Sequence, residues 1–250
     1  MQLPQRDWIA EPLQVLSYGG GVQSTAMLLM IKEGRIPKPD IVVHSDTGSE
    51  LPETEEFIEW AYKFTIRELK IPFVIVKSTY GKLHEFYRST SSIPVIGMRH
   101  CTANFKIAPQ RQFFRSIVGR RNKYMVDCWL GITTDESRRK IESDVKWCRN
   151  KFPLLDDVPT SRQECIEINA KYGLNVPKSG CWLCPYQGGK KWMSLRENHP
   201  ELFQFAMEME EEKKARWGGS IGLYQERPLK DLDDFVLPDS TCDSDAGCFI

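Results

Sequence analysis

Apolar and polar positions alternate in blocks along the first half of the chain. Apolar runs at residues 13–18, 41–44, 71–76 and 124–132 have the length and the composition of buried strands, and helices are expected between them. Strands that alternate with helices pair in parallel. The pattern therefore predicts an α/β fold, in which a mainly parallel sheet is sandwiched by helices.

The alternation of strand and helix patterns ends near residue 150, which predicts a second, C-terminal part of the chain. In this interpretation residues 1–150 form the α/β domain, and residues 151–250 form a smaller helical part that ends in a small, acidic tail. A capping pattern predicts a helix from Thr160 to about Tyr172. An apolar stripe over residues 200–217 predicts a further helix that faces a core.

The turn after the first apolar run is the strongest functional signal. Gly19, Gly20 and Gly21 follow a strand, and Ser24 opens an apolar stretch that fits the start of a helix. Free N–H groups and the helix dipole both favour an anion at such a turn, and phosphate suits that place. No lysine precedes Ser24, so the turn is not the nucleotide P-loop that ends in Gly-Lys-Ser/Thr. A plain turn that needs glycine only for its geometry stays open as the alternative.

Two further strand ends carry polar residues. Asp46 follows the second apolar run, and ligands bind at the carboxyl ends of strands in open α/β sheets. Gly131 ends the fourth run and leads into Arg138 and Arg139, which suit an anion-facing edge because arginine makes bidentate contacts. A basic helical stretch over residues 106–121 is more often a solvated face than a binding surface.

Eight cysteines are many for a chain of 250 residues. The Cys181-x-x-Cys184 knuckle brings two thiolates to one point, which suits zinc, an iron–sulfur cluster or thiol–disulfide exchange. Cys128 lies in an apolar run and is expected to pack in the core. Cys242 and Cys248 lie in the tail, where acidic neighbours should raise a thiol pKa.

The bulk numbers exclude several classes of protein. The 34 Lys and Arg residues balance the 34 Asp and Glu residues, so the chain lacks the strongly basic balance of many nucleic-acid-binding proteins, although a local patch stays open. No apolar run approaches the ~20 residues of a membrane span. The N-terminus lacks a signal-peptide pattern. We therefore expect a cytoplasmic protein without membrane association, working as an oligomer or in a complex.

These motifs, taken in order, resemble the phosphoadenosine-phosphosulfate reductase-like proteins and the PP-loop ATP pyrophosphatases of the adenine nucleotide alpha-hydrolase superfamily. The resemblance covers most of residues 13–190 and starts with the Ser17-Tyr18-Gly19-Gly20-Gly21-Val22-Gln23-Ser24 segment. It implies a Rossmann-like fold. The chain departs from the family at three positions: Gly19 stands for a serine of the PP-loop, Gln23 for its aspartate, and Thr133 for an arginine.

The resemblance implies two sets of site residues. The nucleotide, ATP or phosphoadenosine phosphosulfate with Mg²⁺, would be bound by Ser17, Gly19, Gly20, Gly21, Gln23, Ser24, Asp46 and Gly131. The catalytic set would contain Asp46, Lys106, Arg138, Cys242 and Cys248.

The resemblance also implies a metal centre. Cys101 and Cys165 lie in segments that match the family in other respects, so we expect them to bind a [4Fe–4S] cluster together with Cys181 and Cys184. Zinc held by the same four cysteines is the second choice.

Three functions follow as hypotheses. The first is an ATP pyrophosphatase that adenylates its acceptor during sulfur transfer to a nucleic acid, either thiolation or DNA phosphorothioation, with a cysteine desulfurase as a candidate partner. The second is a sulfonucleotide reductase that releases sulfite, with a tail cysteine as the nucleophile and thioredoxin as the partner. The third is a non-catalytic subunit that binds nucleotide and cluster, which the change to Gln23 keeps open.

Overall fold

The computed structural model describes residues 6–177, 179–219 and 222–235, and it divides into two compact units that interleave along the chain. The sequence pattern put a boundary near residue 150, whereas the first unit continues through Ser179. The first unit contains Met1–Asp46, Pro52–Val76 and Ile107–Ser179, and the second contains Thr47–Leu51, Lys77–Lys106 and Gly180–Ile250.

The first unit is built on a five-stranded sheet with the order β3-β2-β1-β4-β5. β1 pairs in parallel with β2 and β4, as the sequence pattern predicted, and β4 pairs in parallel with β5. The fifth strand was not expected from the sequence. The strands are β1 (Leu13–Ser17), β2 (Ile41–Asp46), β3 (Phe73–Lys77), β4 (Val126–Trp129) and β5 (Cys148–Lys151).

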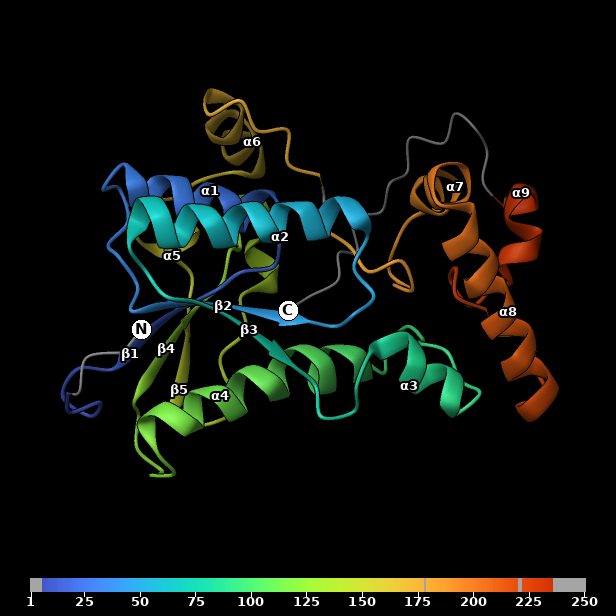
Figure 1. Ribbon diagram of the computed structural model, residues 1–250, viewed down its shortest axis with the longest axis horizontal. Coiled ribbons are helices and arrows are strands. Elements are labelled where there is room, and N and C mark those ends of the chain that lie inside the picture. The colour runs from blue at the N-terminus through green and yellow to red at the C-terminus, as the bar shows by residue number, and fades with distance from the viewer. Residues whose placement is uncertain (1–5, 178, 220–221, 236–250) are drawn as a thin grey trace. The chain divides into compact units, whose positions relative to one another are not determined.

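Helices cover both faces of this sheet. Figure 1 shows α1, α2 and α6 on one side and α4 on the other, so the expected α/β sandwich is present. The helical elements of the unit are α1 (Val22–Lys32), α2 (Pro52–Phe64), the π-helix η1 (Thr65–Leu69), α4 (Ala108–Val118), the 3₁₀-helix η3 (Thr134–Arg139), α5 (Pro153–Asp156) and α6 (Arg162–Lys171).

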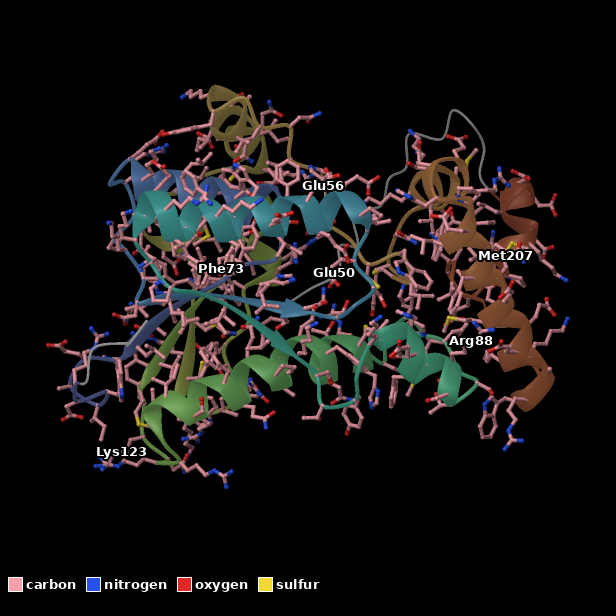
Figure 2. All side chains as sticks on the ribbon, in the orientation of Figure 1. Glu50, Glu56, Phe73, Arg88, Lys123 and Met207 are labelled. Atoms are coloured by element: carbon pink, nitrogen blue, oxygen red, sulfur yellow. The ribbon has the colours of Figure 1, made fainter. Side chains whose placement is uncertain are left out.

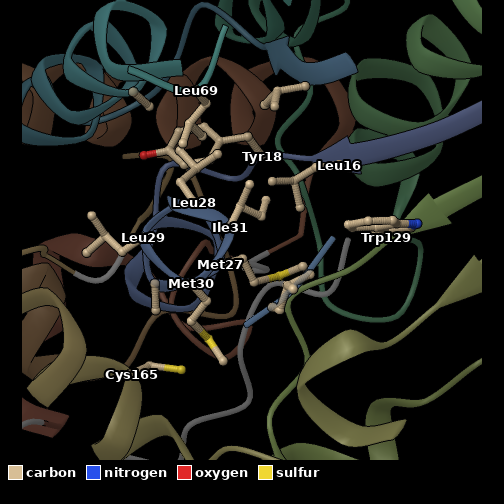
Figure 3. Close-up of a cluster of buried hydrophobic side chains, with 14 of the residues drawn as sticks. Leu16, Tyr18, Met27, Leu28, Leu29, Met30, Ile31, Leu69, Trp129 and Cys165 are labelled. Carbon is tan, nitrogen blue, oxygen red and sulfur yellow. The ribbon is translucent and has the colours of Figure 1, made fainter. Parts of the chain in front are cut away.

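The helix α1 is the centre of the larger hydrophobic cluster of the first unit. Its residues from Ser24 to Ile31 are all buried, because the sheet, α2 and α6 surround it. Figure 3 shows Met27, Leu28 and Met30 inside this cluster. Each fully buried Leu or Met side chain contributes about 1.5–3 kcal/mol to stability. The buried helix therefore fixes the position of the glycine turn that precedes it.

The second unit is helical and has its own core around the fully buried Trp192 and Phe105. The stripe expected on the helix over residues 200–217 is confirmed, because Phe203, Ala206 and Met209 are buried in this core. Its elements are α3 (Leu83–Ser89), the π-helix η2 (Thr102–Ile107), α7 (Gly189–Asn198), α8 (Pro200–Trp217), the 3₁₀-helix η4 (Leu229–Asp231) and α9 (Leu232–Phe235). Within the described residues, no helix has the length and apolar character needed to span a membrane.

Candidate functional site

The glycine turn joins β1 to the first turn of α1. Gly20 has a φ of +74°, and a Cβ at this position would lie 2.9 Å from Thr54 Cγ2 and 3.3 Å from Ile58 Cγ1. Gly21 is extended and is the residue that immediately precedes the helix. The first N–H groups of α1 have no partner within the helix, and they carry the positive end of its dipole. The turn thus has the geometry of an anion site.

Ser24 closes this turn from inside the helix. The N–H of Gly21 donates to Ser24 Oγ at 3.3 Å, and the Ser24 hydroxyl donates to the Gly21 carbonyl at 3.1 Å. The Ser24 side chain is buried. It therefore stabilises the backbone of the turn, whichever ligand the turn binds.

Two distant segments reach the same turn. A Cβ on Gly131, which follows β4, would lie 3.2 Å from Gln23 Cβ and 3.3 Å from the backbone nitrogen of Ser24. A Cβ on Gly21 would lie 2.7 Å from the Ser179 hydroxyl oxygen. The parallel sheet thus brings the predicted Gly131 to the first turn of α1, and Ser179 is a neighbour that the sequence analysis missed.

The amide of Gln23, at the aspartate position of the PP-loop, binds a carboxylate. Its Nε2 donates to Glu136 Oε2 at 3.2 Å, and Glu136 forms an ion pair with Arg139 at 2.6 Å. The neighbouring Arg138 is exposed and forms no ion pair within the described residues. Arg138 is thus a cation close in sequence to this network that is available to a ligand.

A buried glutamine that the sequence analysis missed ties the ends of two strands together. Gln110 Nε2, on α4, donates to Ser17 Oγ at 3.0 Å and to Ser45 Oγ at 3.1 Å. Ser17 ends β1, and Asp46 ends the neighbouring β2 directly after Ser45. Ser17 and Asp46 therefore share the sheet edge from which the glycine turn starts, as predicted for residues at the ends of parallel strands.

The cysteine knuckle lies in the second unit and pairs with a short extended segment. Leu51 N–H donates to Gly180 O at 3.0 Å, and Trp182 N–H donates to Ser49 O at 3.1 Å. The N–H of Cys184 donates to the carbonyl of Cys181 at 3.1 Å, which closes the turn between the two cysteines. These bonds fix the knuckle before any metal binds.

Local charges act on the Cys181 thiol. Burial and then the Glu50 carboxylate raise its pKa, and Lys106 and the Leu183 N–H oppose them. Figure 2 labels Glu50, whose backbone pairs with Cys181 in an isolated bridge. Cys101 adds to the rise in the pKa of Cys181. Lys106 thus acts on a cysteine of the knuckle within the second unit.

The four predicted metal ligands are divided between the units. Cys101 and Cys181 pack at the edge of the core of the second unit, which also contains Cys184. Cys165 is fully buried in the first unit, where Figure 3 places it beside Met30, and burial raises its pKa to about 12. Within the described ranges, no three His, Cys, Asp or Glu side chains are arranged to hold a metal ion. Cys242 and Cys248 lie outside the described residues.

The first unit is thus a nucleotide-binding type of α/β sandwich with a glycine turn at its ligand edge. Residues 14–161 match the model of the phosphoadenosine phosphosulfate reductase domain. The match covers more than half of the chain, and the chain belongs to this family.

One curated relative is an uncharacterised protein of Methanocaldococcus jannaschii, which is 25% identical over 198 residues. That match covers 75% of this chain and 45% of the relative, so the chain spans less than half of the relative's length.

Two solved structures are similar to the chain at low identity. Phosphoadenylyl-sulfate reductase from Candida auris, as a phosphate complex, has a TM-score of 0.46 at 14% identity and covers 67% of this chain and 75% of its own. The U34-tRNA thiolase NcsA from Methanococcus maripaludis, with its [4Fe-4S] cluster, has a TM-score of 0.43 at 16% identity and covers 94% and 85%.

Proposed function

We propose that the chain binds ATP at the glycine turn and cleaves it to pyrophosphate while it adenylates an acceptor for sulfur transfer. The observation that carries this proposal is the turn itself, in which Gly20 and Gly21 bring backbone N–H groups to the open end of α1. Phosphates are the anions that such a helix terminus favours. The resemblance of residues 17–24 to the PP-loop supports ATP as the nucleotide.

The reaction is a nucleophilic displacement at phosphorus. An oxygen of the acceptor attacks the α-phosphorus of ATP, the bond to the β-phosphate oxygen breaks, and pyrophosphate leaves. The outer sulfur of a donor persulfide then attacks the adenylated acceptor, and AMP leaves. A second thiol breaks the S–S bond, so that the sulfur stays on the acceptor and the two thiols end as a disulfide that a dithiol reductant such as thioredoxin reduces. Asp46 would hold Mg²⁺ near the phosphates, and Arg138 would balance the charge of the leaving group.

The family match favours a second candidate, reduction of a sulfonucleotide. In that reaction a thiolate attacks the sulfur of phosphoadenosine phosphosulfate, and adenosine bisphosphate leaves. A second thiol then releases sulfite, and the two thiols end as a disulfide that thioredoxin reduces. Cys242 or Cys248 would provide the nucleophile.

We further propose that Cys101, Cys181 and Cys184 hold a [4Fe–4S] cluster, with zinc as the alternative. The three cysteines belong to one unit, Cys101 and Cys181 pack against the same core, and the knuckle backbone is fixed by hydrogen bonds. Thiolate donors suit both metals. Cys165 is fully buried in the core of the other unit, and we assign it a packing role.

One pair of parallel assays separates the candidates. The chain is purified without oxygen and incubated with ATP and Mg²⁺, and pyrophosphate is measured; a second sample receives phosphoadenosine phosphosulfate and thioredoxin, and sulfite is measured. Pyrophosphate without sulfite supports the ATP proposal. Sulfite alone contradicts it and establishes the reductase. Nucleotide binding without either product, with candidate acceptors present, contradicts both and favours a non-catalytic subunit.

A further inference from the structure

The turn that follows α4 displays a cluster of exposed cations. Arg120, Arg121 and Lys123 are exposed, and within the described residues none of the three has an ion pair or a hydrogen bond from its side chain. Lys146 is exposed as well, next to Trp147, whose carbonyl accepts from the backbone of residue 125. Lys123 is labelled in Figure 2. We call Arg120, Arg121, Lys123 and Lys146 the cationic turn.

The backbone of the cationic turn is held in place. Arg115 donates from Nη1 to the carbonyls of Gly119 at 3.0 Å and Arg121 at 2.7 Å. The guanidinium of Arg115 also lies 3.9 Å from the centre of the Trp147 ring, in a cation–π contact. The cations therefore project from a fixed scaffold, which lowers the entropy lost when they bind a partner.

The surroundings of these cations discriminate between two kinds of acidic partner. A protein interface needs an apolar centre, whereas binding to a phosphate backbone is mainly electrostatic. Among the described residues, the turn over residues 119–123 contains no hydrophobic side chain. Arginine also binds phosphate in a bidentate manner. We propose that the cationic turn binds the phosphate backbone of a nucleic acid.

The cationic turn and the glycine turn lie on neighbouring strands of the first unit. The cationic turn precedes β4, and the glycine turn follows the parallel β1, so the two lie at opposite ends of the same sheet. The seven residue steps from Lys123 to Leu130 span about 23 Å along an extended chain, which equals about seven phosphates of one nucleic-acid strand. Arg149 on the edge strand β5 pairs with the buried Asp127 at 3.0 Å, so its charge is already balanced within the unit. An acceptor that reaches both the cationic turn and the glycine turn must therefore be a polynucleotide rather than a mononucleotide.

This inference deepens the proposed function, since it names the class of acceptor, but binding is tested without ATP. The full chain is titrated into a labelled single-stranded RNA of about 20 nucleotides over a salt series, and fluorescence anisotropy is measured. The Arg120→Gln/Arg121→Gln/Lys123→Gln variant should bind at least about tenfold more weakly at low salt, and its log–log salt slope should fall by about 2. A matched control replaces three exposed cations elsewhere: Arg67→Gln/Lys214→Gln/Arg216→Gln.

The outcomes are distinct. Absence of RNA binding by the unaltered chain, or equal losses in the two triple variants, overturns the inference. Tighter binding of a poly-glutamate peptide of equal charge also overturns it and identifies an acidic protein as the partner. RNA binding that depends on the cationic turn supports the inference even where no pyrophosphate is released. RNA binding therefore tests the inference, and pyrophosphate release separately tests the proposed function.

Discussion

Gly20 and Gly34 have nearly the same backbone angle but different surroundings. Their φ values are +74° and +73°, yet a Cβ on Gly20 would meet Thr54 at 2.9 Å, whereas nothing lies within 4 Å of one on Gly34. Gly34→Ala should cost about 1–2 kcal/mol of unfolding free energy, the backbone penalty alone. Gly20→Ala should cost about 1–3 kcal/mol more because of overpacking, and it should weaken nucleotide binding. Urea unfolding and nucleotide titration measure both effects.

Gly34→Ala is the control for this comparison, because Gly34 has the same left-handed backbone conformation as Gly20 but lies away from the glycine turn. Equal stability losses in the two variants, with equal nucleotide affinity, would show that the contact of Gly20 with α2 is unimportant. That result would contradict the prediction that a side chain at residue 20 disturbs the glycine turn.

The bond between Gln23 and Glu136 gives a second prediction. Gln23→Asp restores the aspartate of the PP-loop but replaces an amide donor with a carboxylate that faces Glu136. We expect the variant to lose about 1 kcal/mol of unfolding free energy, since both partners are partly exposed. Gln23→Asp/Glu136→Gln should recover the loss, because the new amide can donate to the aspartate. A double-mutant cycle in urea measures the coupling, and additive losses would contradict the prediction.

The replacement of the PP-loop aspartate by Gln23 could be recognised in the sequence, but the hydrogen-bond partner of Gln23 could not be predicted. Glu136 lies 113 positions away, and only the sheet brings it to the glycine turn. Gln110 is a similar case, because a glutamine on a helix gives no sequence signal for a bridge between two strand ends. Residues placed by strand order were predictable, and residues that reach the site through side-chain packing were not.

Among the elements, α8 makes a contact whose stability should depend on pH. The buried Glu210 accepts from the N–H groups of Leu223 at 2.6 Å and Leu229 at 2.8 Å. Burial raises its pKa to about 7; the two backbone bonds oppose the shift, Glu211 adds to it slightly and Lys213 opposes it. The folded state therefore binds this proton more tightly than the unfolded state, whose carboxyl has a pKa near 4.5.

The sign of the effect follows from this difference in proton binding. As pH rises from about 4.5 to about 7, Glu210 should reduce the unfolding free energy by up to about 3 kcal/mol, and above that range the reduction should be constant. Hydrogen exchange of the Leu223 and Leu229 amides between about pH 4.5 and about pH 7 measures this loss of stability at the contact itself, as a fall in their protection factors. Glu210→Gln should remove the dependence, and the exposed Glu211→Gln should retain it. A slope that survives in Glu210→Gln would assign it to another group.

The element that the sequence analysis missed was β5. Its residues, Cys148-Arg149-Asn150-Lys151, contain one buried apolar position, because an edge strand has only one paired neighbour and much of it faces solvent. Propensity and periodicity cannot identify four such residues. The other four strands were predicted because each provides several apolar residues to a core that lies on both faces of the sheet.

At the scale of the whole molecule, the division into units explains why the cysteine set could not be assigned from the sequence. Three segments contribute to each unit, so order along the chain does not indicate which cysteines share a core. The knuckle signal at Cys181 and Cys184 depends only on local spacing and could be recognised. The membership of Cys101 and Cys165 depends on how the segments interleave, which needs the tertiary structure.

The last prediction separates metal ligation from packing. Cys165→Ala should lower the unfolding free energy by about 1–2 kcal/mol, because it opens a small cavity beside α1, and should leave the iron content per chain unchanged. Cys101→Ala, Cys181→Ala and Cys184→Ala should each lower the iron content. Metal analysis of chains purified without oxygen measures iron and zinc together. Zinc in place of iron would show that the same cysteines bind zinc rather than an iron–sulfur cluster. Loss of metal in Cys165→Ala, in a chain that is still folded, would show that Cys165 provides a fourth thiolate to the metal centre.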